Sequence, residues 1–148
     1  MQYLNNVSIS VGSVLKPAGL EKAVDIITAG YQKEHSDPRF KDDAGLNKWR
    51  EFMNKYMPEG NLDDNFNVYG YGVAQTLEQV LKQSGDNLTR ANVMKQAASL
   101  KNVQIDTLLP GITISTGPND FAPIEAVQLQ KFDGKRWDLF GDVISAAQ

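Results

Sequence analysis

The last part of the chain carries the signal that most restricts its fold. Apolar and polar residues alternate over Val127–Lys131, and apolar residues recur again at Trp137, Leu139 and Val143. Asp133-Gly134 stands between these two runs. An Asp-Gly pair in this setting is the strongest short-range signal for a tight turn between antiparallel strands. The sequence therefore predicts a β-hairpin at the C-terminal end.

Two segments in the first third of the chain are predicted to be strands. Met1–Ile9 mixes apolar and polar residues, and Val24–Thr28 is rich in β-branched residues. The polar loop after them contains Pro38, which rules out a central strand there. His35, the single histidine, lies in this loop and is expected at the solvated surface.

Three helices are predicted between the strands and the hairpin. Asp42 or Asp43 can cap the first, Gly85 ends the second, and Thr89 caps the third. The spacing of apolar residues predicts the side chains that face inward. They are Leu46, Trp49, Met53 and Tyr56 in the first helix, Val73, Leu77, Val80 and Leu81 in the second, and Val93, Met94, Ala97 and Leu100 in the third.

The composition excludes several classes of function. The chain has no cysteine and one histidine, so it offers neither a thiol nucleophile nor a site with two histidine ligands. Its formal net charge is -3, with no basic stripe that could neutralise a nucleic-acid backbone. No apolar run approaches the roughly 20 residues of a membrane span. We expect no cofactor, no metal ion and no nucleic-acid partner.

Short motifs for catalysis are isolated. Ser13 and Lys16 match a Ser-x-x-Lys nucleophile pattern, but its companion Ser-Asp-Asn and Lys-Thr-Gly elements are absent. Gly70 and Gly72 resemble part of a dinucleotide-binding turn, but no apolar strand precedes them. The sequence favours a protein that is not an enzyme, with a small enzyme using Ser13 and Lys16 as one alternative.

Two segments are candidates for a small-ligand site. FNVYGYG places Phe66, Tyr69 and Tyr71 at a helix start, either as core packing or as the wall of a pocket. LNNVSIS offers Asn5, Asn6 and Ser8 in a loop that leaves a strand. Ligands usually bind at such an edge of an α/β sheet.

The order of segments resembles a known family. In order these are AGLEKAVDII, WREFMNKYMPEG, VYGYGVAQTLEQVLKQSGDNLTRANVMKQAASL, LLPGITIS and QLQKFDGKRWDLFG. Together they resemble the C-terminal part of substrate-binding proteins of branched-chain amino acid ABC transporters. This is the Leu/Ile/Val-binding type, which has a type 1 periplasmic-binding fold. The resemblance covers essentially all 148 residues.

The resemblance implies an α/β chain that forms part of a two-lobed fold. Residues 1–65 would be part of the C-terminal lobe, 66–120 would be helices that return to the N-terminal lobe, and 121–148 would hold the last crossing strands and the hairpin. The early N-terminal lobe would be missing. We therefore expect a fragment that exposes apolar faces and pairs with a second copy of itself.

The resemblance also implies a function. Proteins of this family are periplasmic or otherwise extracytoplasmic, close over a branched-chain amino acid or a related small solute, and dock on an ABC permease in the membrane. A sensory or regulatory module of the same fold, binding a small ligand, is the alternative.

The candidate ligand contacts are Asn5, Asn6, Ser8, Phe66 and Tyr69. Of these, the resemblance implies ligand positions for the loop of Asn5 and Asn6 and for Phe66. Asparagines stand where the family often has an acidic residue, and an amide cannot supply the charge that a buried ammonium group needs. This favours a ligand other than a simple α-amino acid. Asp25 stands where the family often has glycine, which indicates a divergent member.

Overall fold

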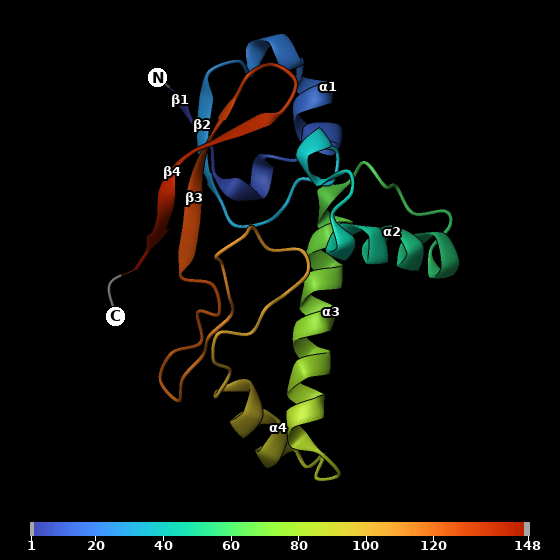
Figure 1. Cartoon of the computed structure of the whole chain (residues 1–148), viewed down its shortest axis with the longest axis vertical. Coiled ribbons are helices and arrows are strands. Elements are labelled where there is room, and N and C mark those ends of the chain that lie inside the picture. Colours follow the sequence, from blue (N-terminus) through green and yellow to red (C-terminus); the bar gives the residue numbers. More distant parts are fainter. Residues whose placement is uncertain (1, 147–148) are drawn as a thin grey trace.

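The computed structural model describes residues 2–146 and shows a four-stranded sheet with the helices to one side of it (Figure 1). The architecture is α/β, as predicted. Short 3-10 or π-helical turns fill several of the connections. The main elements are β1 (Gln2–Tyr3), α1 (Lys16–Ala18), β2 (Ile26–Gly30), α2 (Ala44–Tyr56), α3 (Asn65–Ser84), α4 (Arg90–Ala97), β3 (Ala126–Phe132) and β4 (Trp137–Ser145).

The sheet has the order β1-β2-β3-β4, with β1 parallel to β2 and the other pairs antiparallel. The predicted strand over Met1–Ile9 is wrong beyond Tyr3, and Met1 lies outside the described residues. The Asn5 side chain accepts a hydrogen bond from the Val7 N–H at 3.1 Å and so starts a 3-10 turn. Such local side-chain bonding competes with strand pairing.

The second predicted strand is confirmed, but it begins two residues later, at Ile26. Asp25 has a φ of 68°, in the left-handed region that favours glycine. Its N–H donates to the carbonyl of Phe132 at 2.9 Å, which fixes the entry into β2. A glycine would adopt this backbone conformation without the steric strain of a side chain.

The C-terminal hairpin is confirmed, since β3 and β4 pair from Phe132 opposite Trp137 to Ala126 opposite Ser145. Gly134 has a φ of 97° at the first central position of the turn, where glycine is favoured. Trp137 is 1% exposed, and its indole N–H donates to the Ile9 carbonyl at 2.9 Å. The hairpin is thereby attached to the chain after β1.

The helix ends agree with the predicted capping residues. Asp43 accepts from the Leu46 N–H at 2.9 Å, and Thr89 accepts from the Asn92 N–H at 3.5 Å. Gly85, with a φ of 57°, follows the last residue of α3. Each cap satisfies a backbone group that a helix end leaves without an internal partner.

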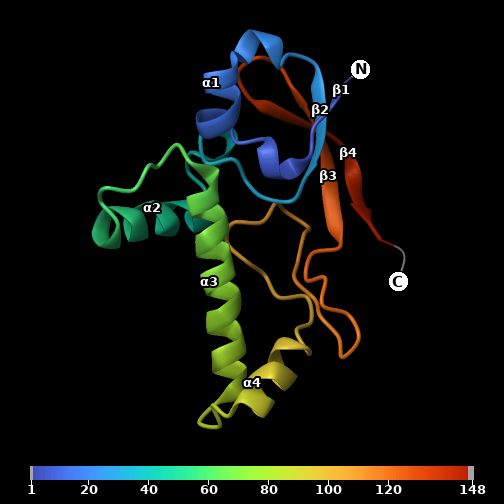
Figure 2. The same cartoon turned by 180° about the vertical axis from the view of Figure 1, so that it is seen from behind.

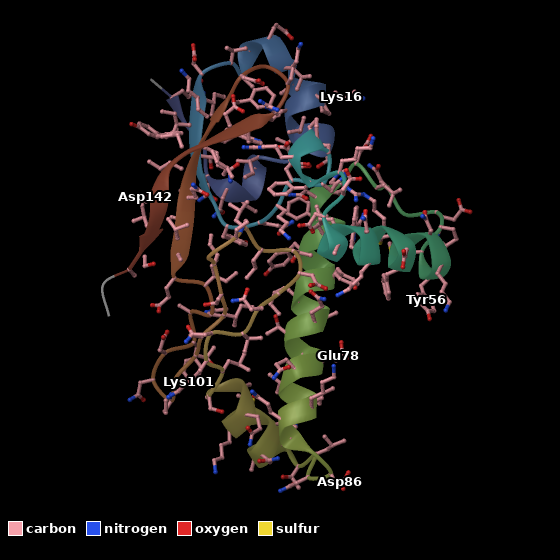
Figure 3. The ribbon with its side chains drawn as sticks, in the orientation of Figure 1. Lys16, Tyr56, Glu78, Asp86, Lys101 and Asp142 are labelled. Atoms are coloured by element: carbon pink, nitrogen blue, oxygen red, sulfur yellow. The ribbon has the colours of Figure 1, made fainter. Side chains whose placement is uncertain are left out.

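The buried face of α2 matches the prediction for Leu46, Trp49 and Met53, which are at most 3% exposed. Tyr56 does not match, because it lies at the end of α2 and is 64% exposed (Figure 3). Val68, Phe40 and Tyr71 complete the small cluster around these three side chains. α2 is thus fixed mainly by its first three turns.

The predicted inward face of α3 is wrong for three of its four residues. Val73, Leu77 and Leu81 are 51%, 54% and 41% exposed, whereas Val80 is 4% exposed. The stripe that packs inward contains Val68 and Gly72. It is rotated about the helix axis by about one residue position from the predicted stripe. Gly72 sets this rotation, because a Cβ there would come within 2.6 Å of Thr107 Oγ1.

The predicted inward face of α4 is also only partly correct. Met94 is 58% exposed, whereas Leu100, just beyond the helix, is 2% exposed. Val93 and Ala97 are partly buried and pack against the core cluster that contains Leu100. α4 therefore covers this cluster with one narrow side.

The core is divided into separate clusters rather than one continuous interior. One cluster lies under the sheet, around Phe132 and Trp137, and another joins α3 and α4 to the segment 100–114. In both orientations α3 runs from the α1 end of the molecule to α4 at the far end (Figures 1 and 2). The junction between the two clusters falls near the end of β2 and the start of α3.

Candidate functional site

A cavity of about 330 Å³ lies at this junction. It is formed by the chain just after β1, the chain just after β2 and the first turns of α3. β1 and β2 are parallel, so both carboxyl ends lie at the same edge, where ligands of open α/β sheets bind. The lining residues are Asn6, Val7, Ile9, Ser10, Tyr31, Gln32, Asn65, Phe66 and Tyr69.

Ser10 holds the rim of this cavity together. Its Oγ accepts from the N–H of Ser13 at 3.4 Å and from the Ser13 hydroxyl at 2.8 Å. The N–H of Asn65 also donates to Ser10 Oγ, at 3.4 Å, so one hydroxyl joins the turn after β1 to the start of α3. Gln32 adds a third segment, because its Nε2 donates to the Asn65 carbonyl at 3.0 Å.

The start of α3 is capped from outside the cavity. Asp64 Oδ1 accepts from the Phe66 N–H at 3.1 Å and from the Ser13 hydroxyl at 3.3 Å. A carboxylate at this position is stabilised by the positive end of the helix dipole. The Asp64 carboxylate therefore serves the helix start and is not one of the cavity-lining groups.

The cavity wall combines apolar and aromatic side chains with neutral polar ones, and none of its lining residues carries a formal charge. Burial, and in second place the nearby Tyr69, raise the pKa of the Tyr31 phenol above its ordinary value. The Tyr31 hydroxyl therefore stays protonated at physiological pH. Asn65 Oδ1 is buried and has no hydrogen-bond partner within residues 2–146. A buried acceptor of this kind gains stability from a donor that reaches it.

The structure brings three of the five predicted site residues to the cavity. Asn6, Phe66 and Tyr69 line it, with the two aromatic side chains 51% and 49% exposed. Asn5 does not line it, because its side chain caps the 3-10 turn. Ser8 lies in the same turn and is also not among the lining residues.

Sequence reasoning missed Ser10, Tyr31, Gln32 and Asn65. Tyr31 and Gln32 directly follow the predicted strand that became β2, so they lie at its carboxyl end. Their position directly after a predicted strand could have identified them as candidate site residues. Ser10 and Asn65 are 55 residues apart in sequence, and nothing in the sequence pattern pairs them.

An apolar groove of about 430 Å³ adjoins the cavity and shares Tyr31, Gln32 and Tyr69 with it. The outward-facing Val73 and Leu77 of α3 line this groove, together with side chains of α4 and the segment 105–124. The face of α3 that was predicted to be buried thus borders open space. The groove is an exposed apolar surface of the kind that usually contacts another chain or a ligand.

A set of buried ionisable groups lies in the loop after β2. Glu34 is 6% exposed, and burial raises the pKa of its carboxyl group to about 7. Its Oε1 accepts from the Ser36 hydroxyl at 3.1 Å and lies 3.7 Å from His35 Nε2. Glu34 Oε2, His35 Nε2 and Trp49 Nε1 are buried without hydrogen-bond partners among the described residues.

The expectation that His35 lies at the solvated surface is wrong. Its side chain is 8% exposed, and its ring lies 5.3 Å from that of Trp49. Burial lowers the pKa of His35, which disfavours its protonated form. The loop folds inward because Lys33 pairs with Asp43 at 2.8 Å and so anchors it to the start of α2.

Ser13 and Lys16 do not form a nucleophile and base. The Ser13 hydroxyl bonds to Ser10 and Asp64, and no hydrogen bond joins it to Lys16 in the described part of the chain. No group of three or more His, Asp or Glu side chains suited to a metal ion occurs within residues 2–146. Over the same residues, no helix has the length and apolar character to cross a bilayer.

Comparison with models of known protein families finds no match, and comparison with curated proteins finds none either. A solved structure is similar over 99% of this chain, with a TM-score of 0.77 and 14% sequence identity. It is the crystal structure of a branched chain amino acid ABC transporter from Thermus thermophilus with bound valine. The chain spans 40% of the length of that protein. The fold is that of part of a type 1 periplasmic-binding protein.

Proposed function

We propose that the chain is part of the extracytoplasmic solute-binding component of an ABC importer and is not an enzyme. Its solute would be a branched-chain amino acid or a related small carboxylate or amide. The cavity at the carboxyl ends of β1 and β2 is the observation that carries this proposal. The fold shared with a transporter protein that holds valine supports it.

The solute would bind between two lobes, of which this chain supplies parts of both. Residues 1–65 would belong to the C-terminal lobe, 66–120 to the N-terminal lobe, and 121–148 to the last crossing and the hairpin. The separate clusters around Trp137 and around Leu100 support this division, while a third cluster joins α2 to Val68 of α3 across its first boundary. The permease and the periplasmic location belong to the same proposal and concern the protein as a whole.

The proposal is tested by titrating the isotope-labelled chain with valine, leucine and isobutyramide. Amide chemical shifts in NMR spectra measure this binding, including weak binding in the millimolar range. We expect saturable shifts at Asn6, Tyr31 and Asn65, which line the cavity. Absence of saturable shifts at these residues with every solute would refute a solute site here.

A matched pair of variants locates the site. Tyr69→Ala removes a half-exposed ring from the cavity, and Tyr56→Ala removes a 64% exposed ring at the far end of α2 (Figure 3). Neither ring is in the core, so both variants should fold. Tyr69→Ala should weaken solute binding, while Tyr56→Ala should leave it unchanged. Equal effects would place binding elsewhere.

We also propose that the chain on its own forms a homodimer through the outer face of α3. Val73 and Leu77 are more than half exposed on this face. Glu78 lies in the half of α3 nearer α4 (Figure 3), and no charged residue precedes it within the helix. An uncharged apolar helix face of this length favours association with a matching surface.

A further inference from the structure

We infer that the solute presents an uncharged, hydrogen-bond-donating group and a flat apolar face to this cavity wall, and not an ammonium group. The inference rests on the proposed function and specifies the chemistry of the ligand. It follows from three properties of the wall, namely its lack of charge, its free acceptor and its aromatic side chains.

The lack of charge is the first property. A buried ammonium or carboxylate needs an opposite charge or a complete set of hydrogen bonds, because loss of water is costly. The nearest charged side chains in sequence are already engaged. Lys33 Nζ contacts Asp43 Oδ2 and the Asp106 carbonyl, both at 2.8 Å, and Asp64 caps α3. Neither Lys33 nor Asp64 lines the cavity.

The free acceptor is the second property. Asn65 Oδ1 is buried without a partner among residues 2–146, although its backbone N–H and carbonyl are bonded to Ser10 and Gln32. The backbone is therefore fixed, and the side-chain oxygen has no bond to give up when a donor reaches it. The Nε2 of Gln32 is used as a donor to the Asn65 carbonyl, which leaves its Oε1 as a second amide acceptor. Two neutral acceptors favour a ligand with N–H or O–H donors.

The aromatic side chains are the third property. Phe66 and Tyr69 are about half exposed and line the same cavity as Asn65. Aromatic faces bind planar or aliphatic apolar groups well. A primary amide or a hydroxyl attached to a compact apolar group satisfies both the rings and the acceptors. A neutral amide is thus the simplest ligand that this wall fits.

The test compares probes that share one ring and differ in charge. The isotope-labelled full chain is titrated with benzamide, benzoate, benzylamine (a cation at neutral pH) and valine. We expect benzamide to bind about tenfold or more tightly than benzoate and benzylamine, because an unpaired charge loses its hydration in the cavity. Its shifts should include the side-chain amides of Asn65 and Gln32.

Three variants sharpen the result. Asn65→Ala should weaken benzamide binding, and Asn65→Asp should reverse the preference in favour of benzylamine. Aspartate is favourable in the first turn of a helix, so Asn65→Asp should fold. Asn54→Ala is the control, because Asn54 is exposed on α2 and does not line the cavity. It should leave all affinities unchanged.

The outcomes separate this inference from the proposed function. Binding of benzylamine or valine by the unaltered chain at least as tightly as benzamide overturns the inference and leaves solute binding intact. An Asn65→Asp variant that keeps the original preference overturns the role of Asn65 and with it the inference. If no probe shifts any cavity residue at millimolar concentration, both the inference and the proposed function fail.

Discussion

Replacing Glu34 by glutamine should stabilise the chain at alkaline pH and leave it unchanged in acid. Glu34 is 6% exposed, and burial raises the pKa of its carboxyl group from 4.5 to about 7. An acid with a raised pKa holds its proton more tightly in the folded state than in the unfolded state. Stability is therefore full below pH 4.5 and falls as the pH rises to about 7.

The size of the effect follows from the shift in pKa. Each unit of pKa difference corresponds to about 1.4 kcal/mol, so ionisation of Glu34 costs on the order of 3 kcal/mol above pH 7. Glutamine matches the protonated carboxyl group in shape and keeps an oxygen for the Ser36 hydroxyl, which donates to Glu34 Oε1 at 3.1 Å. Glu34→Gln should thus be close to neutral at about pH 4 and stabilising by about 3 kcal/mol at about pH 8.

Urea denaturation at several pH values measures the difference in the free energy of unfolding between the two proteins. Burial lowers the pKa of His35 in both proteins, so its contribution largely cancels in the difference. Glu59→Gln is the matched control, because Glu59 is exposed. It should give a small difference that does not vary with pH.

Two results would refute this reasoning. A Glu34→Gln effect of the same size at acid and alkaline pH would mean that Glu34 ionises normally in the folded chain. A variant that is less stable at about pH 8 would mean that the ionised carboxylate forms a favourable pair with His35, whose Nε2 lies 3.7 Å from Oε1.

Four further predictions concern α3 and its N-terminal cap. Gly72→Ala should destabilise the chain by about 1–3 kcal/mol, because a Cβ would lie 2.6 Å from Thr107 Oγ1. Gly70→Ala should stabilise the chain by about 0.5–1 kcal/mol, since a Cβ there meets nothing within 4 Å. Urea denaturation measures the free energy of unfolding of both glycine variants. Asp64→Ala should cost about 1 kcal/mol in the same assay through loss of the cap, and an unchanged midpoint would contradict that role. Leu77→Glu should convert the chain to a monomer in sedimentation experiments. Its stability should change little, because Leu77 is 54% exposed. Persistence of the dimer would exclude this face of α3 as the interface.

The features that sequence predicted well depend on neighbours in the chain. Asp43 caps the helix that begins at Ala44, and Gly134 occupies the turn that its own dipeptide specifies. Both interactions are complete within a few residues, so local pattern is sufficient. The overall fold followed from the order of such elements.

The features that sequence failed to predict depend on distant contacts. Periodicity found the apolar stripe of Val73 and Leu77, but the inward face of α3 was decided by Gly72, which packs against Thr107. A glycine adds little to an apolar pattern even where close packing requires it. In the same way, the burial of Glu34 and His35 depends on Trp49 and on the Lys33–Asp43 ion pair.

The candidate site was predicted only in part, because some of its residues stand out in the local sequence and others are brought to the cavity by distant contacts. Phe66 and Tyr69 stand out as an aromatic cluster at a helix start, and Asn6 leaves a strand end. Asn5 has the same residue type as Asn6, but its side chain is used by the adjoining turn. Only the geometry of that turn distinguishes the two asparagines.

The hydrogen bonds of Ser10 constrain how the sequence can diverge over evolution. Positions 10, 13 and 65 share one hydroxyl, and a Cβ at Gly12 would lie 2.3 Å from the Asp63 carbonyl. Asn65 contributes only its backbone N–H to this bond, so it is substitution of Ser10, Gly12 or Ser13 that requires compensation elsewhere. Asn6 and Tyr69 also line the cavity, but their side chains take no part in these hydrogen bonds of Ser10, so they can change one at a time. A lineage can thus alter its solute at these positions while it keeps the rim of the cavity.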